Sequence, residues 1–402
     1  MKLCYLVYRE DNVMVYESQV LEYLRAYESK NIFDSIELLL FRHEKNLTKG
    51  KESENRIKQY IKKGHTFWSF PVLSMIQLKF DVLRLKNYLQ NHYDRADNIA
   101  VICRGDLAAY IGTRAFSGYP NSRILYDNRG LAFEESLMSY PNSIIHKVNR
   151  NIKRKALLAA KDFCDSYNFV TTNMREYFIK HYQFDENIPY TIIPTLYQSV
   201  VCDEIKLQQI RQQENYHEDD TVIGYIGSTA AWQSMNTLVS TIAKIGQKMP
   251  KAKFLILTNG GIPEMQKLTN NIKKRIVIKN IPHNKMNYYL QIIDIGIIVR
   301  DNTIINHVAA PTKIAEYLTN GIKILYSGDI GIIDDLKEYN NNELMINMDT
   351  DEHWLEHLVN GKKEKHIDQR IAQYFDMDRR QDDTYKMLIQ SFFNKKHMLN
   401  KH

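Results

Sequence analysis

The chain has 402 residues, of which 44% are hydrophobic and 25% charged, and a formal net charge of +7. Its length favours two domains over a single core, and its composition is that of an ordinary globular protein. The modest charge lacks the dense basic stripe with interleaved aromatic residues that indicates a nucleic-acid partner, so we expect no such partner.

Cysteine spacing and hydropathy suggest the compartment. The four cysteines are far apart and form no CxxC pair, which argues against a disulfide framework or a structural zinc and suits a reducing cytoplasm. The N-terminal segment is too short for a signal-peptide core, and no segment approaches the roughly 18 uncharged apolar residues of a transmembrane helix. We expect a cytoplasmic protein, either soluble or peripheral at the inner face of the membrane.

Short β-rich runs alternate with helical stretches through the first half of the chain, a pattern typical of parallel α/β layers. Strands are expected at residues 2–8, 35–41, 98–103, 123–127 and 168–172. Helices are expected near residues 16–30, 52–63, 71–91, 105–117, 143–163 and 173–182. A further strand begins near residue 189 and runs into an irregular piece that ends at residue 199.

A polar segment without glycine or proline, residues 202–220, is the expected connection between two domains, with a helix inside it. The pattern then restarts, with strands expected at 221–227, 252–258, 275–279, 292–299, 322–327 and 343–348. Helices are expected near 232–248, 263–272, 283–291 and 311–320, and the C-terminal segment is polar and mostly helical.

This pattern predicts an α/β protein with two Rossmann-like, doubly wound parallel-sheet domains. The predicted boundaries are residues 1–198 and 199–375, followed by a helical tail at 376–402. Two such sheets facing a central cleft would place the binding site at the carboxyl ends of their strands.

The densest basic run, residues 146–162, leaves its role open. A helix with a solvated charged face explains it, and so does contact with an anionic membrane surface or a lipid-linked substrate. Nucleic acid is the least favoured partner for this run.

The segment Ala309–Gly321 is predicted to be a short helix with an uncapped start. Pro311 suits the first helical position and Gly321 the left-handed stop, whereas Ala310 has no side chain that could cap the helix. Free N–H groups at a helix start form an anion site, to which Lys313 adds a positive charge and Thr312 a hydroxyl donor.

Glu316 lies one turn further along, on the same helix face as Thr312. A carboxylate cannot help to bind a phosphate, but it can accept hydrogen bonds from vicinal hydroxyls such as those of a ribose. Phosphate at the helix start and ribose one turn away describe a nucleotide diphosphate. An ordinary surface helix, with Lys313 and Glu316 paired at i,i+3, is the alternative.

Other loops follow strands of the same predicted sheet. Arg300 lies at the exit of the strand at 292–299, and Gly227 and Ser228 lie between the strand at 221–227 and its helix. Glycine at such a turn lets backbone N–H groups approach a phosphate closely. Asn259, in the loop 258–261, and the loop 280–286 could flank the same ligand or form plain turns.

The stretches "GYIGSTAAW", "IPHNKMNYYLQIIDIGIIVRDN" and "APTKIAEYLTNGIKILYSGDIG" resemble the donor domain of GT-B glycosyltransferases, specifically the family 4-like enzymes of bacterial surface-polysaccharide synthesis. In the first half, "ICRGDLAAYIGTRAF" and "ILYDNRGLAFEES" resemble loops of the acceptor domain more weakly. The resemblance implies metal-independent, hexosyltransferase-like transfer from a nucleotide sugar with retention at the anomeric carbon. It also implies that the C-terminal helices return to the first domain.

By the same resemblance, Glu316 matches the carboxylate that holds the donor ribose, and Gly227 matches the turn near the diphosphate. The chain departs from the family pattern at Val308, where an acidic residue is usual, and lacks the usual Arg and Lys after Gly227. The glycine pair of the first loop is missing as well. Arg300, Pro311, Thr312 and Lys313 are therefore expected to meet the diphosphate charge.

On the acceptor side, the expected catalytic residues are Asp127, Arg129 and Glu135, with Arg104 and Asp106 nearby. Asp127 or Arg129 could contact the sugar, and Glu134 or Glu135 could activate the acceptor hydroxyl. Equally, Asp127 with Arg129, and Arg104 with Asp106, could be ion pairs that brace turns.

No metal or cofactor is expected, because the nucleotide sugar is itself a substrate. The triplet "DTD" at 349–351 lies after the sheet pattern has ended, the histidines lack metal-ligand spacing, and GxSxG is absent. Two alternatives stay open: a nucleotide-sugar or saccharide-binding protein without turnover, and a nucleotide-sugar epimerase of the same fold.

Overall fold

The computed structural model describes residues 1–10, 16–43, 55, 57–70, 73–197, 199–200, 202–229, 233–282, 285–339, 344–360 and 367–393. The chain forms two compact units: unit 1 comprises Met1–Pro194 with Met377–His402, and unit 2 comprises Thr195–Asp376. Parts of several sequence predictions lie outside the described residues, namely 52–54, 56 and 71–72 in two predicted helices, 230–232 after Gly227, 283–284, 343 at the start of a predicted strand, and 394–402 in the predicted tail.

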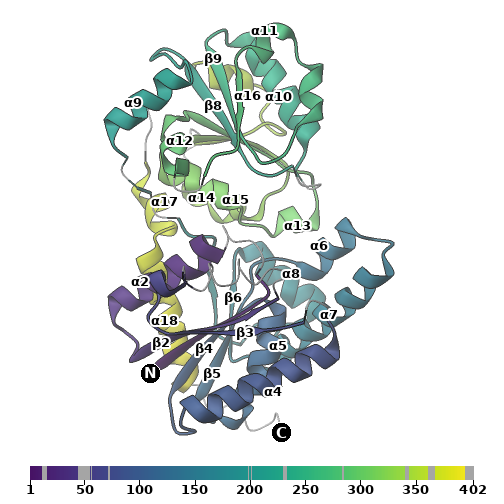
Figure 1. Ribbon diagram of the computed structural model, residues 1–402. Helices are drawn as coiled ribbons and strands as arrows, with labels where there is room; N and C mark the ends of the chain where they lie inside the picture. The colour runs from purple at the N-terminus through teal and green to yellow at the C-terminus, as the bar shows by residue number, and fades with distance from the viewer. Residues whose placement is uncertain are drawn as a thin grey trace. The chain divides into compact units, whose positions relative to one another are not determined.

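Unit 1 is built on a seven-stranded parallel sheet. Its strands are β1 (Lys2–Tyr8), β2 (Ser35–Arg42), β3 (Gly64–Trp68), β4 (Ile99–Arg104), β5 (Ser122–Asp127), β6 (Ser166–Phe169) and β7 (Tyr190–Ile192). The spatial order is β3-β2-β1-β4-β5-β6-β7, so the direction of winding reverses between β1 and β4. The central strands are almost wholly apolar because helices cover both faces of the sheet (Figure 1).

The helices of unit 1 are α2 (Glu22–Lys30), which continues a π-helical turn at Glu17–Leu21, α4 (Met75–His92), α5 (Asp106–Ala115), α6 (Ala132–Ser139), α7 (Ile144–Phe163), α8 (Thr172–Tyr182) and α18 (Met377–Phe393). Although α18 follows unit 2 in the sequence, it packs against α2 and β5. Arg123 Nε donates to Ser391 O at 2.9 Å, and Gln381 Nε2 donates to Tyr23 O at 2.6 Å. The last described helix therefore belongs to unit 1.

Unit 2 has a six-stranded parallel sheet of order β10-β9-β8-β11-β12-β13. Its strands are β8 (Thr221–Ile226), β9 (Ala252–Leu257), β10 (Ile276–Lys279), β11 (Ile295–Val299), β12 (Lys323–Ser327) and β13 (Met345–Asn347). Its helices are α9 (Glu204–Gln213), α10 (Met235–Lys248), α11 (Asn270–Lys273), α12 (Met286–Ile292), α13 (Ile304–His307), α14 (Thr312–Thr319), α15 (Gly331–Asp335), α16 (Trp354–Asn360) and α17 (Gln369–Tyr374). Here the winding reverses between β8 and β11.

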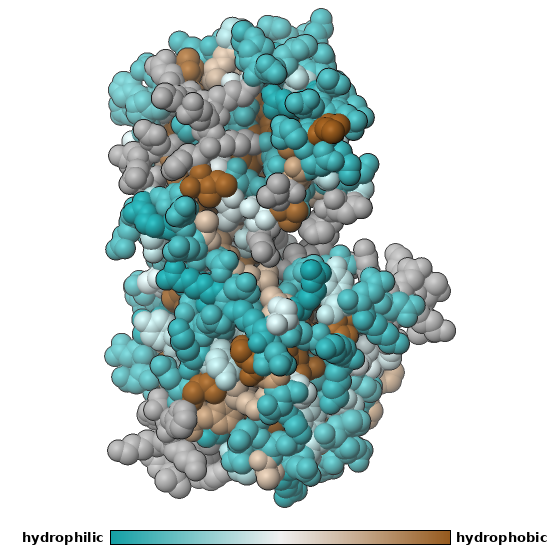
Figure 2. Space-filling model, turned by 90° about the vertical axis from the view of Figure 1, so that its left-hand side faces the viewer, coloured by the Kyte–Doolittle hydropathy of each residue, from teal (hydrophilic) through white to brown (hydrophobic). Residues whose placement is uncertain are grey.

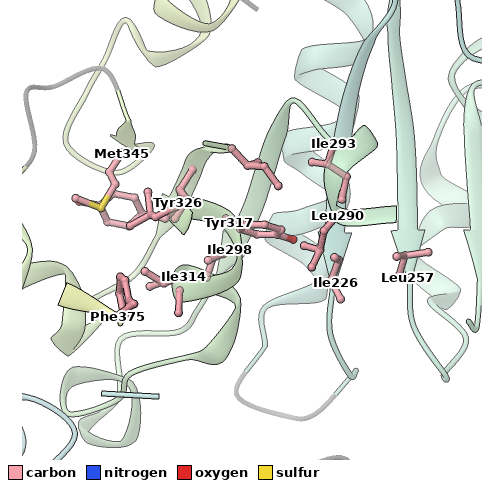
Figure 3. Close-up of a cluster of buried hydrophobic side chains, with 14 of the residues drawn as sticks. Ile226, Leu257, Leu290, Ile293, Ile298, Ile314, Tyr317, Tyr326, Met345 and Phe375 are labelled. Carbon is pink, nitrogen blue, oxygen red and sulfur yellow. The ribbon is translucent and has the colours of Figure 1, made fainter. Parts of the chain in front are cut away.

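The core of unit 2 fixes α14 against the sheet (Figure 3). Tyr317 is fully buried and reaches from α14 toward Leu290 and Ile226. Gly296 on β11 makes this possible, because a Cβ there would lie 2.4 Å from two ring carbons of Tyr317. The start of α14 is thus held at the carboxyl end of the sheet by buried apolar packing.

The main alternation of strands and helices is confirmed, and the differences have local causes. The strand predicted at 168–172 is β6 at Ser166–Phe169, because Thr171 caps α8 by accepting a hydrogen bond from Met174 N at 3.0 Å. Edge strand β3 was not predicted, since it is short and mostly exposed. The helix predicted at 263–272 is instead a 3₁₀ turn, Pro263–Lys267, followed by the single turn of α11.

The surface is mixed. The face shown in Figure 2 is mostly hydrophilic, with hydrophobic residues in small separate groups. Within the described ranges, no helix combines the length and apolar character needed to cross a bilayer.

Candidate functional site

In unit 2, the predicted donor residues gather around the point where the winding reverses. Gly227 and Ser228 follow β8, and Arg300 follows β11. In open parallel sheets the crevice at the carboxyl ends of the strands, where the winding reverses, is the usual position for a ligand. The sequence predictions for these three residues therefore fall on one edge of one sheet.

The loop after β8 is held by nearby side chains. Gly227 N donates to Leu257 O at 3.1 Å, and a Cβ at Gly227 would lie 2.9 Å from oxygens of Gln233 and Tyr225. Tyr225 Oη donates to Ser228 O at 2.8 Å, and Gln233 Nε2 donates to Ser228 Oγ at 3.0 Å. A side chain at residue 227 would therefore require Gln233 or Tyr225 to shift.

The next loop lies beside it. A Cβ on Gly260 would approach Thr229 Oγ1 to 2.7 Å, so the loops after β8 and β9 touch. Thr258 Oγ1 accepts from Gly260 N at 3.2 Å, and Asn259 is exposed at the tip. Asn259 thus borders the same edge as Gly227.

Arg300 is half-buried at the end of β11 and keeps its charge without an acidic partner. Within the described part of the chain, no carboxylate forms an ion pair with it. Burial lowers the pKa of its guanidinium, and the nearby Tyr225 only partly opposes that shift. A guanidinium remains protonated in proteins, so Arg300 is an uncompensated cation at this edge.

The start of α14 is uncapped, as the sequence predicts, but Pro311 occupies a different position. With φ −58° and ψ 130° it is the N-cap residue, and Thr312 is the first helical residue. The proline ring fixes φ at a helical value but leaves ψ free, so it did not enforce a helical start here. No side chain of the cap residue accepts from the first turn, whereas α4, α7, α8 and α9 all have side-chain caps.

Glu316 and Lys313 are paired. Lys313 Nζ lies 2.6 Å from Glu316 Oε2, with side-chain exposures of 25% and 10%. The i,i+3 pairing considered above is therefore present, and it partly neutralises Lys313. Val308, where the resembling family usually has an acid, is 1% exposed and belongs to the apolar interior.

The two aspartates of the triplet at 349–351 contact nearby residues of unit 2. Asp349 Oδ2 accepts from Gly328 N at 2.7 Å, and Asp351 Oδ2 lies 2.9 Å from His357 Nδ1. Asp349 thus contacts the loop after β12, and Asp351, which precedes α16, contacts a histidine within that helix.

Unit 1 has a cavity of about 710 Å³ at the carboxyl edge of its sheet, where the winding reverses between β1 and β4. The predicted acceptor-side residues Arg104, Asp106, Arg129 and Glu135 all line it. Asp127, the last residue of β5, is not a lining residue, but the next residue, Asn128, is.

Asp127 and Arg129 form the brace that the sequence left as an alternative. Arg129 Nε lies 2.9 Å from Asp127 Oδ1, and its Nη1 donates to the carbonyls of Ile193 and Pro194 at 3.2 and 3.3 Å. Asn168 Nδ2 donates to Asp127 Oδ1 at 2.6 Å, and Asp127 is 2% exposed. The carboxylate is saturated by internal partners, and any contact of this pair with a substrate stays a prediction.

Asp106 and Glu135 are two of the three carboxyl groups that line the cavity, and Glu10 is the third. Burial raises the pKa of Asp106 to about 6, although its bond from the Tyr126 hydroxyl acts in the opposite direction. Burial likewise raises the pKa of Glu135, opposed by the charge of Lys153. A carboxyl group with a raised pKa can exchange a proton near neutral pH.

Glu134, the neighbour of Glu135, is engaged elsewhere. Its Oε1 accepts hydrogen bonds from the hydroxyls of Tyr177, at 3.0 Å, and Tyr182. Of the two carboxylates that the sequence could not separate, Glu135 is the one that lines the cavity.

No protein-family model matches the sequence, and no curated protein matches it. The structure is similar to a glycosyltransferase from Rickettsia africae, with a TM-score of 0.63 and 14% identity over 97% of this chain and 98% of that chain. It is also similar to Anabaena Alr3699/HepE in complex with UDP-glucose, with a TM-score of 0.59 and 13% identity over 97% and 98% of the two chains. A third similar structure is WaaG, a glycosyltransferase involved in lipopolysaccharide biosynthesis, with a TM-score of 0.56, 11% identity and 98% of each chain covered.

This chain has the GT-B fold. At such low identities the likeness concerns the fold, and the chemistry depends on this chain's own residues. In the GT-B fold found here, each unit has polar groups at the edge where its winding reverses.

Sequence reasoning missed several residues that line the cavity of this GT-B protein, among them Asn128 and Lys153. Asn128 stands between two residues that were singled out. Lys153 lies in the basic run 146–162, and only its spacing from Ile145 and Asn149, at i, i+4 and i+8, could have indicated that these three share a face.

Proposed function

We propose that this chain is a retaining glycosyltransferase that moves a sugar from a nucleotide-diphosphate sugar to a saccharide or lipid-linked acceptor in surface-polysaccharide synthesis. The observations that carry this proposal are Arg300, which has no carboxylate partner among the described residues, and the uncapped start of α14, both at the carboxyl edge of the unit 2 sheet. Such an arrangement of a buried cation and free helical N–H groups favours a diphosphate.

In this proposal unit 2 binds the donor. Arg300, the first N–H groups of α14 and the turn at Gly227 contact the diphosphate, and Glu316 accepts from the ribose hydroxyls. Two structures of similar fold contain UDP or UDP-glucose, so UDP-sugars are the first donors to test. Arg300 would also stabilise the charge that develops on the leaving diphosphate.

Unit 1 binds the acceptor in its cavity. The bond from the anomeric carbon to the diphosphate oxygen breaks, the bond to the acceptor oxygen forms on the same face, and the acceptor proton ends on the released nucleoside diphosphate. The reaction needs no metal in this proposal, since Arg300 and α14 meet the diphosphate charge. Glu135 orients the acceptor hydroxyl, while Asp127 and Arg129 hold the turn that carries Asn128 and Gly130.

We further propose that α7 brings the enzyme to an anionic membrane at the cytoplasmic side. Ile144, Ile145 and Val148 are 80%, 73% and 53% exposed, next to the basic residues of the run 146–162. Exposed apolar residues flanked by Lys and Arg suit binding in the plane of an anionic lipid surface.

The first test is donor binding and turnover in wild type and Arg300→Gln, with Lys244→Gln on the exposed face of α10 as the matched control. UDP-, GDP-, ADP- and CMP-sugars are screened by thermal stabilisation and by nucleotide release. Loss of a charge-assisted contact predicts roughly 10- to 100-fold weaker binding of the preferred nucleotide in R300Q, and no change in K244Q.

Three other outcomes would change the proposal. Binding without release of nucleotide from any donor would favour a binding protein, an alternative that fits the commitment of Lys313 to Glu316. Conversion of the donor into an isomeric nucleotide sugar would favour an epimerase. Equal nucleotide affinity in R300Q and wild type would contradict the proposed anion site in unit 2.

A further inference from the structure

The cavity of unit 1 contains buried hydrogen-bond donors that the chain itself does not satisfy. Within the described residues, Nε and Nη1 of Arg104 and Nδ2 of Asn128 are buried without a hydrogen-bond partner. Both residues line the cavity. Leaving such groups unpaired costs about 1–3 kcal/mol each, and more for charged ones, so their retention indicates a ligand.

A third nitrogen of the guanidinium holds the Arg104 side chain in place. Its Nη2 donates to Gln19 Oε1 at 2.7 Å, and its side chain is 5% exposed. The nearest carboxylates lie 3.7 Å from Nη1, at Asp127, and 3.9 Å from Nε, at Glu10. These distances give electrostatic attraction but no hydrogen bonds, so two N–H groups of a fixed guanidinium stay available.

Asn128 is equally fixed. Its Oδ1 accepts from Gly130 N at 3.0 Å, which settles which end of the amide is the oxygen, and the residue is 1% exposed. The NH₂ group must therefore be the other end, and it has no partner. Both donors come from strand ends that face this cavity.

The start of α5 adds a partial positive charge to the same lining. Gly105, its N-cap residue, has φ 79° and offers no side-chain cap, and no atom lies within 4 Å of the position that a Cβ would take. The space beside Gly105, at the start of this ten-residue helix, is therefore open. Helix starts of this kind favour anions.

The cavity also has acceptors. Asp106 Oδ1 accepts from the Tyr126 hydroxyl, while its Oδ2 is buried without a partner. The basic side chains of the lining are Arg9, Arg104, Arg129 and Lys153, and its carboxylates are Glu10, Asp106 and Glu135. A simple anion would leave Asp106 Oδ2 unsatisfied, whereas a ligand with both an anionic group and hydroxyls matches donors and acceptors together.

We propose that this cavity binds a phosphate-bearing sugar or polyol. Its phosphate oxygens accept from Arg104 and Asn128 in front of α5, and one of its hydroxyls donates to Asp106 Oδ2. The proposal names the chemical class of the acceptor. Only the identification of this ligand as the acceptor rests on the proposed function. The phosphate could belong to a soluble molecule or to a lipid headgroup.

Asn128→Asp is the sharpest variant, because it keeps the oxygen that accepts from Gly130 N and replaces the donor by a carboxylate. Full-length protein is titrated with inorganic phosphate, sn-glycerol 3-phosphate and farnesyl phosphate at constant ionic strength, and the thermal midpoint is followed. We expect saturable stabilisation of wild type and at least tenfold weaker binding in N128D. Arg104→Gln should act in the same direction, and Lys79→Gln, exposed on α4 outside the cavity, should behave as wild type.

The two organic probes separate the possible sources. Tighter binding of glycerol phosphate indicates a soluble acceptor, and tighter binding of farnesyl phosphate indicates a lipid-linked one. The proposal is overturned if no probe binds, if N128D binds phosphate as wild type does, or if only Arg300→Gln abolishes binding, which would place the anion in unit 2. UDP affinity is measured in the same proteins, and a wild-type protein that binds phosphate in this cavity but does not bind UDP would contradict the donor assignment alone.

Discussion

At the scale of single residues, the charges of the candidate sites differ in whether the protein itself balances them. Asp127 is paired with Arg129 and accepts a hydrogen bond from Asn168, and Glu316 is paired with Lys313. Arg300, by contrast, has no carboxylate partner among the described residues. Charge that the protein leaves unbalanced is a better indicator of a ligand than charge it has already paired, because burial of an unpaired charge is costly.

Asp106 offers a test of this cost. Its pKa of about 6 lies above the ordinary value of 3.8, so the folded state binds more protons than the unfolded state between these pH values. Its contribution to stability therefore falls as pH rises from about 4 to 6, and the full cost persists above pH 6. A shift of this size corresponds to roughly 3 kcal/mol.

Asp106→Asn should remove that cost while keeping an oxygen to accept from the Tyr126 hydroxyl. We expect the variant to be more stable than wild type at pH 7–8, by up to about 3 kcal/mol, and equal to it below about pH 4. Chemical denaturation across this pH range measures the difference. A gap that does not change with pH would show that Asp106 does not titrate as described.

At the scale of elements, the residues of α7 have three different environments. Ile145, Asn149 and Lys153 line the cavity, Ile152 and Ala156 are buried in the unit, and Ile144 and Val148 are exposed. The basic run could not be assigned from sequence because the direction of each side chain depends on which face packs. Lys153 faces the cavity and not open solvent.

The exposed face of α7 gives a second test. Replacing Ile144 and Val148 by Ser should weaken binding to phosphatidylcholine vesicles that contain phosphatidylglycerol by at least about fivefold, because apolar area is lost from the lipid contact. Co-sedimentation measures the bound fraction. Ile205→Ser, an equally exposed apolar residue on α9, is the matched control, and equal losses in both proteins would argue against a specific role for α7.

At the scale of the whole molecule, unit 1 is built from two segments that are separated in the sequence by unit 2. Residues after Met377 return to unit 1, where Gln381 and Leu388 are fully buried. Unit 1 therefore needs the end of the chain to complete its core, although unit 2 intervenes.

Leu388→Ala should destabilise unit 1 selectively. A cavity of this kind costs about 2–5 kcal/mol, and hydrogen exchange resolved by peptide should show faster opening in residues 1–194 with little change in 195–376. The exposed neighbour Gln390→Ala should leave both unchanged. Faster exchange confined to unit 2 would contradict the assignment of α18.

The sequence indicated the fold class and the positions of several candidate residues because those features are local. Alternating apolar runs predicted two doubly wound sheets, and the uncapped start of α14 was visible in its own residues. Gly227 and Arg300 were placed directly after strands by the same pattern, and both follow strands in the structure. Their positions follow from chain order, since parallel strands bring their carboxyl ends to one edge.

Other features required distant residues to meet, and only the tertiary structure decided them. Whether Lys313 is free, whether Asp127 is saturated, and whether Arg104 and Asn128 keep unused donors all depend on partners far away in the chain or on side-chain direction. The sequence by itself therefore determined two Rossmann-like sheets and a bare helix start. Tertiary packing determined which charged groups are paired within the protein and which remain available to a ligand, because hydrogen-bond partners must lie close together in space.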